Sequence, residues 1–147
     1  MNAFVNSNTN SLINKYKKLS VHTASKEQIL LMLYQTAIKD TKLAIKSIDE
    51  KKVAAKGEHI GHLQDIIIEL MHALDFSIDS KLANELSSLY DFLLYSSTQA
   101  NVKIDKRPLM DCLKILETLY SAWNQAIKDL KSSPANHQQK ELKGEQV

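Results

Sequence analysis

The residues best suited to chemistry are histidines, acidic residues and one cysteine, all in segments with helical spacing. Glu69 and His72 form a Glu-x-x-His motif, which di-metal four-helix bundles use twice, together with a Glu from each of the other two helices. This chain has one such motif, and a helical projection turns it away from the apolar face of its segment. His59 and His62 could share a metal ion, but no third ligand is evident nearby in the sequence. The pattern therefore indicates solvated side chains and no metal centre.

Cys112 is the only cysteine, so no disulfide can form within the chain, and a reducing compartment is the simpler interpretation. Its position near the edge of an apolar stripe predicts a buried, inert thiol. A nucleophile would need a partner base, and no residue suggests one. The three glycines are scattered, so no Gly-rich phosphate loop is present. We therefore expect neither an enzyme nor a bound cofactor.

Length and charge exclude further classes of protein. The chain has 147 residues, the length of a single domain, and a net charge of +2. It lacks the basic face that nucleic-acid binding requires. No apolar run approaches the roughly 20 residues of a membrane span, and the first 30 residues show no signal-peptide pattern. We expect a cytoplasmic protein that neither binds nucleic acid nor inserts into a membrane.

Apolar residues spaced by three and four predict four helices, and the scarcity of glycine and proline favours long ones. Ser25 and Gln28 form a capping box at the first start, and Gly57 marks the expected break after the first helix. The expected helices are Lys26–Lys52, Glu58–Asp75, Lys81–Val102 and Pro108–Lys131. Their core-facing stripes are Leu30, Tyr34, Ala37, Thr41, Ala44 and Ile48; Ile60, Leu63, Ile67, Leu70 and Leu74; Leu82, Leu86, Leu89, Leu93 and Ala100; and Leu109, Leu113, Leu116, Tyr120, Trp123, Ile127 and Leu130.

Short links between consecutive helices favour antiparallel neighbours, and strand signals are absent. The prediction is an all-α protein, an antiparallel up-and-down four-helix bundle in residues 25–131. Residues 1–24 are polar with scattered apolar residues and are expected to be a flexible segment, which could form one short helix. Residues 132–147 are polar and are expected to be a disordered tail.

Most of these helices carry more apolar residues than one buried stripe requires. Ile29 to Tyr34, for example, are six apolar residues in succession. Single exposed apolar residues are common, and a wide stripe can pack a thick core. The surplus nevertheless recurs along the chain, and contiguous apolar surface usually binds a partner, often an amphipathic helix. The residues outside the expected stripes are Ile29, Met32, Leu33, Leu43, Ile68, Phe92, Tyr95, Val102, Ile115 and Leu119.

Four sequence blocks, in the same order, resemble the FliS family of flagellar export chaperones. Asn14, Lys15 and Tyr16 precede Val21 with the spacing of the family's N-A-Y and Val, and "TASKEQILLMLYQTAI" follows. The other blocks are "QDIIIELMHALD", "LANELSSLYDFLLYSSTQAN" and "LKILETLYSAW". The resemblance covers about residues 14–130.

The resemblance implies a non-catalytic cytoplasmic chaperone that binds the disordered C-terminal segment of flagellin, prevents its premature polymerisation and keeps it competent for export. In the family the chain's own N-terminal segment can cover part of the client groove, which makes Tyr16 and Val21 candidates for that cover. The flagellar export gate is a further expected partner. From the residues alone, a helical adaptor that binds another amphipathic helix stays open as the alternative.

Overall fold

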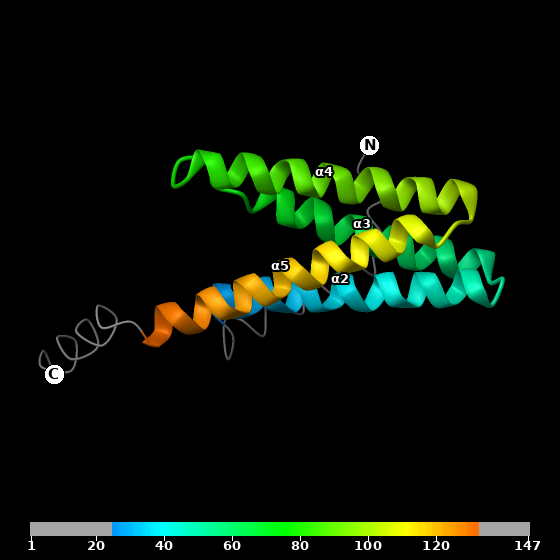
Figure 1. Cartoon of the computed structure of the whole chain (residues 1–147), viewed down its shortest axis with the longest axis horizontal. Coiled ribbons are helices and arrows are strands. Elements are labelled where there is room, and N and C mark those ends of the chain that lie inside the picture. Colours follow the sequence, from blue (N-terminus) through cyan, green and yellow to red (C-terminus); the bar gives the residue numbers. More distant parts are fainter. Residues whose placement is uncertain (1–24, 133–147) are drawn as a thin grey trace, which may run out of the picture.

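The computed structural model describes residues 25–132, which form four α-helices. In chain order these are α2 (Lys26–Asp49), α3 (Val53–His72), α4 (Ser80–Lys103) and α5 (Arg107–Ser132). Successive helices run in opposite directions (Figure 1). Helices α2 and α4 each pack against both α3 and α5. The predicted all-α, antiparallel up-and-down bundle is confirmed. The expected N-terminal segment and tail lie outside the described residues, except that Ser132 ends α5.

Side-chain caps fix the starts of two helices. The backbone N–H of Gln28 donates to Ser25 Oγ at 3.3 Å, as the sequence predicts for the start of α2. The N–H of Leu82 donates to Asp79 Oδ1 at 3.0 Å at the start of α4. A cap of this kind stabilises a helix by about 1 kcal/mol because it gives a partner to a backbone donor that the helix leaves unpaired.

The break between the first two helices was predicted wrongly at Gly57. Helix α2 ends at Asp49, and α3 begins at Val53, so Gly57 lies inside α3. The turn is made by Lys51, whose φ of 57° is in the left-handed region. Ile104, between α4 and α5, has a φ of 50°. This conformation normally favours glycine. Neither turn has a glycine at this position, so the sequence does not predict where the turns lie.

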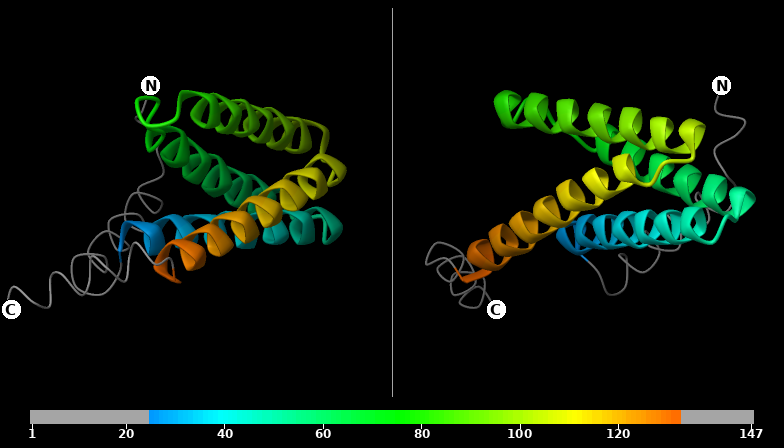
Figure 2. Two further views of the ribbon diagram at one scale, coloured as in Figure 1. Left: turned by 60° about the vertical axis from the view of Figure 1, so that its left-hand side comes forward. Right: turned by 45° about the vertical axis from the view of Figure 1, so that its right-hand side comes forward.

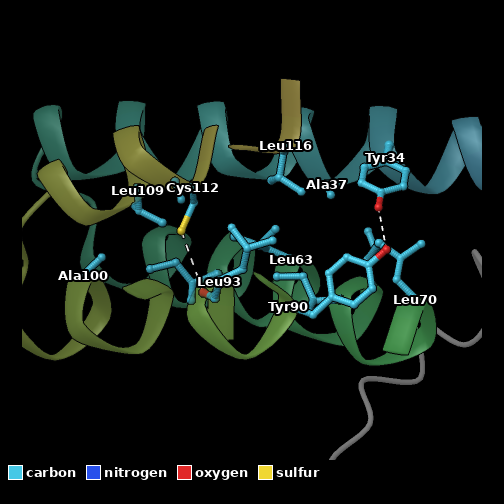
Figure 3. Close-up of a cluster of buried hydrophobic side chains, with 14 of the residues drawn as sticks. Tyr34, Ala37, Leu63, Leu70, Tyr90, Leu93, Ala100, Leu109, Cys112 and Leu116 are labelled. Atoms are coloured by element: carbon cyan, nitrogen blue, oxygen red, sulfur yellow. Dashed lines mark hydrogen bonds between the residues drawn. The ribbon is translucent and has the colours of Figure 1, made fainter. Parts of the chain in front are cut away.

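The core runs along the bundle and consists mainly of the predicted stripes (Figure 3). The residues with no exposed surface in this core are Tyr34, Ala37, Ala44, Ile60, Leu63, Ile67, Leu93, Ala100, Leu109, Cys112 and Leu116. Tyr120 and Trp123 are partly buried and pack against it, as expected for stripe residues. Leu82 and Leu130 were expected in the core but are 43% and 60% exposed. Both lie where the helices separate.

A hydrogen bond and a salt bridge connect the helices at one end of the bundle. Lys56 is buried, and its Nζ donates to the backbone oxygen of Asn101 at 2.8 Å, which joins α3 to the last turn of α4. A cation is favourable there because the carbonyls at a helix C-terminus carry partial negative charge. Lys106 Nζ lies 2.8 Å from Asp49 Oδ1 and links the two inter-helix turns. We call this the closed end.

The helices diverge toward the other end, which we call the open end. There the α3–α4 pair separates from the α2–α5 pair, as both views in Figure 2 show. The open end contains the start of α2, residues 73–79 between α3 and α4, and the end of α5 (Figure 1). This separation exposes side chains that would otherwise belong to the core.

Candidate functional site

An apolar hollow of about 210 Å³ lies between the diverging helix pairs. All four helices and the α3–α4 link contribute to its wall, which is formed by Leu30, Leu70, Ala73, Leu74, Asp75, Ile78, Asp79, Leu82, Ala83, Leu86, Tyr90 and Trp123. For comparison, a dry cavity of about 150 Å³ lined by aliphatic residues binds a benzene ring. The hollow therefore has room for a large apolar side chain.

The two carboxylates in the wall stabilise the link between α3 and α4. Asp75 Oδ1 accepts from the Ser77 backbone N–H at 2.9 Å and also from the Ser77 hydroxyl. These hydrogen bonds hold the pKa of Asp75 below its usual value, and the bond from the Ser77 hydroxyl has the largest effect. Asp79 caps α4. Ile78, between them, is 83% exposed and is available to a ligand.

Three aromatic side chains from three helices meet at the wall of the hollow. The hydroxyl oxygens of Tyr34 and Tyr90 lie 2.5 Å apart (Figure 3), and Trp123 Nε1 donates to Tyr34 Oη at 3.3 Å. Burial raises the pKa of both phenols, so both hydroxyls keep their protons at neutral pH. We call these residues the aromatic trio. Tyr90 and Trp123 line the hollow, whereas Tyr34 lies behind them.

Four of the sequence-predicted contact residues are exposed but lie outside the hollow. Phe92, Tyr95 and Val102 are 45%, 64% and 74% exposed on α4. Their spacing places Tyr95 and Val102 on the side of α4 that faces away from the core, with Phe92 on its flank. Ile68 on α3 is 40% exposed. Their role in binding a partner stays a prediction.

The other predicted contact residues within the described part of the chain are only partly exposed. On α2 these are Ile29, Met32, Leu33 and Leu43, and on α5 they are Ile115 and Leu119. Leu33, Ile115 and Leu119 pack against the core cluster, so part of the apparent surplus widens the core. None of the six lines the hollow. Tyr16 and Val21 lie outside the described residues.

Sequence reasoning missed the hollow itself. Leu30, Leu74 and Trp123 were assigned to ordinary core stripes, and Ile78 was assigned to an interruption between helices. One signal was present: Phe76 and Ile78 place two large apolar residues in a short link, and they are 47% and 83% exposed. Apolar residues in a link between helices have no stripe to join and therefore indicate a contact surface.

The residues suited to catalysis form no reactive site in the described part of the chain. Cys112 is fully buried, as predicted, and its Sγ lies 3.8 Å from the backbone oxygen of Leu93. Burial raises the pKa of its thiol to about 12, so it is not a nucleophile at neutral pH. Residues 25–132 contain no group of three or more metal-binding side chains. None of the helices within this range has the length and apolar character of a membrane span.

Comparison with known proteins identifies the family. The family model described as "Flagellar protein FliS" matches residues 8–130. The flagellar secretion chaperone FliS of Vibrio cholerae is 36% identical over 114 residues, which cover 75% of this chain and 84% of the relative. The Bacillus subtilis protein of the same name is 32% identical over 113 residues, covering 77% and 84%. The one from Salmonella typhimurium is 30% identical over 122 residues, covering 80% and 90%. This chain therefore belongs to the FliS family of flagellar secretion chaperones and is not an enzyme.

Proposed function

We propose that this chaperone binds the C-terminal segment of flagellin in the cytoplasm, prevents its premature polymerisation and keeps it competent for export. The main support for this proposal is the apolar hollow at the open end, in a chain that belongs to the FliS family. Exposed Ile78 and Leu82 extend the apolar wall of the hollow to the surface. A segment that is disordered when free must bury apolar side chains to offset the entropy it loses on binding. The hollow supplies the surface for one such anchor.

The exposed apolar residues on α4 extend the surface beyond the hollow. Phe92 and Tyr95 lie on α4, the helix that also contributes Leu82 and Leu86 to the hollow. A client that places one anchor in the hollow could continue along α4 in an extended path or as a short amphipathic helix. The predicted contact residues Phe92 and Tyr95 therefore belong to the same proposal as the hollow.

We also propose that Tyr16 and Val21 cover part of this surface when no client is bound. The described chain begins at Ser25 at the open end, and Leu30, in the second turn of α2, lines the hollow. The residues that precede Ser25 are therefore attached beside the site. A client must displace such a cover, so the cover lowers the apparent affinity by the free energy of its own contacts.

The only tryptophan of the chain, Trp123, lines the hollow and reports directly on its occupancy. A synthetic peptide with the sequence of the C-terminal segment of the same organism's flagellin is titrated into the full chain. We expect a saturable blue shift of the Trp123 emission and, by calorimetry, a negative heat-capacity change from burial of apolar surface. Absence of binding at tens of micromolar peptide contradicts the proposal.

A pull-down from motile cells separates this proposal from the alternative of a general helical adaptor. Recovery of flagellin through its C-terminal segment supports the chaperone role. Recovery of another protein through an amphipathic helix, with no flagellin, supports the adaptor. The flagellar export gate is a further proposed partner, and the same experiment tests whether a gate component is recovered together with the client.

A further inference from the structure

The aromatic trio contains more hydrogen-bond donors than it uses internally. The indole of Trp123 and the phenols of Tyr34 and Tyr90 each carry one polar hydrogen. Within the trio two bonds form: Trp123 Nε1 donates to Tyr34 Oη, and the two phenol oxygens share one hydrogen across 2.5 Å. Each bond uses one hydrogen. One hydroxyl hydrogen is therefore left without an acceptor inside the trio.

The surroundings assign this remaining hydrogen to Tyr90. If Tyr90 donated to Tyr34, the hydrogen left over would belong to Tyr34, which has no exposed surface and does not line the hollow. A buried donor without a partner costs about 1–3 kcal/mol. If Tyr34 donates to Tyr90, the hydrogen left over belongs to Tyr90, which is 2% exposed but lines the hollow, so of the two phenols it is the one next to space that a solvent or ligand atom can enter. The favoured order of donation is therefore Trp123 to Tyr34 to Tyr90.

We propose that the Tyr90 hydroxyl donates this hydrogen to a backbone carbonyl of the bound client, beside the apolar side chain that occupies the hollow. The inference rests on the proposed function and adds a specificity-determining residue to it. The apolar wall selects a large apolar anchor but tolerates different positions of the segment. A single directional donor favours the one position in which a carbonyl lies opposite Tyr90, and thereby sets the register of the client.

A neutral carbonyl fits this donor better than a carboxylate. The rest of the wall is apolar except for Asp75 and Asp79, so a client carboxylate would lose its hydration and approach two like charges. A backbone carbonyl accompanies every residue of the client and brings no net charge. The last turn of a short helix is especially suitable, because its final carbonyls have no partner within the helix.

Tyr90→Phe tests the proposal because it removes the hydroxyl and keeps the ring. With the full chain and the flagellin C-terminal peptide, we expect the dissociation constant to rise roughly three- to tenfold, the range of one neutral hydrogen bond. Tyr34→Phe is the matched control. It breaks the same bond between the phenols and also the bond to Trp123, but it leaves the Tyr90 hydroxyl in place. We expect it to change the affinity by no more than about twofold.

Equal losses of affinity in both variants would show that the hydroxyls act only through the fold, and an unchanged affinity in Tyr90→Phe would show that the client ignores the donor. Either result overturns the proposal. A second measurement replaces single peptide amides of the client by esters, which weakens the carbonyl as an acceptor and also removes the amide N–H, so the comparison between the two chains isolates the contact with Tyr90. We expect one ester position to weaken binding to the wild-type chain and to have little effect in Tyr90→Phe, which is the coupling that a double-mutant cycle measures.

If Tyr90→Phe does not fold, the ester scan on the wild-type chain decides. One sensitive position supports the proposal, and equal affinity for every ester overturns it. Failure of the wild-type chain to bind the unmodified peptide contradicts the proposed function itself, and with it this inference. Binding without coupling to Tyr90 overturns the inference alone.

Discussion

Replacing Ile78 by alanine tests whether the client docks in the hollow at the open end. Ile78 lies in the link between α3 and α4, lines the hollow and is 83% exposed. The substitution therefore removes little that the folded chain uses. We expect the free energy of unfolding to change by no more than about 0.5 kcal/mol, as is usual for exposed positions.

The effect on binding follows from the apolar surface that the client covers. Isoleucine has three more carbon atoms than alanine, and each buried methylene contributes about 0.8 kcal/mol. Because most of the Ile78 side chain is exposed before binding, nearly all of this can be gained in the complex. The upper limit is about 2 kcal/mol, which corresponds to a roughly 30-fold rise of the dissociation constant. Partial coverage in the complex lowers the free-energy change in proportion, and the dissociation constant then rises by a smaller factor.

The assay is the titration of the flagellin C-terminal peptide followed by Trp123 fluorescence, with Val102→Ala as the matched control. Val102 is also aliphatic, β-branched and 74% exposed, but it lies near the end of α4 at the closed end. A larger loss of affinity for Val102→Ala than for Ile78→Ala would refute the reasoning. It would place the principal contact on the outer face of α4 and leave the hollow without a client.

Three further predictions concern the core, a buried carboxylate and the tail. Trp123→Ala should lower the free energy of unfolding by about 3 kcal/mol, which is the low end for a large aromatic residue because Trp123 is only partly buried. Chemical unfolding followed by circular dichroism measures this loss, and an unchanged midpoint would show that Trp123 does not support the core. Burial raises the pKa of Asp40, and the positive charges of His62, His59 and Lys39 offset only part of that rise. Asp40 Oδ2 has no hydrogen-bond partner among the described residues. The folded chain therefore binds the Asp40 proton more tightly than the unfolded chain and loses stability as the pH rises from the ordinary Asp value of about 4 through the raised pKa. Asp40→Asn should raise the melting temperature at pH 7 and lose this advantage at pH values below about 4, and a lower melting temperature at pH 7 would contradict this account. Deletion of residues 133–147 should leave melting temperature and client affinity nearly unchanged, because that sequence is polar and has no apolar period; a large loss of affinity would assign the tail to the binding site.

The sequence predicted the helices well because their positions depend on a periodic signal. Leu63, Ile67 and Leu70 recur at helical spacing, and all three are buried on one face of α3. The turn at Lys51 could not be predicted in the same way. It needs a left-handed residue, and the chain uses lysine there while placing Gly57 inside a helix. Local propensity favours a turn at Gly57 and tertiary packing favours one at Lys51, and the packing determines where the chain turns.

The hollow could not be predicted because periodicity shows which face of a helix is apolar but not how far apart two apolar faces lie. Leu63 and Trp123 are both stripe residues, yet Leu63 is fully buried and Trp123 lines the hollow. The difference arises from the divergence of two helix pairs, which depends on contacts between segments far apart in the chain. Likewise, composition could not separate Leu33, which packs against the core, from Tyr95, which is exposed.

Both ends of the described chain, Ser25 and Ser132, leave the bundle at the open end (Figure 1). Any peptide joined covalently at either end is therefore held near the hollow at an effective concentration that is typically millimolar for a short flexible linker. Free client at micromolar concentration competes with that attached segment at a disadvantage of roughly a thousandfold. A flanking segment consequently needs only weak intrinsic affinity to keep the hollow occupied. By the same relation, a client segment fused to the end of α5 should fill the hollow in a single-chain complex even when the isolated peptide dissociates readily.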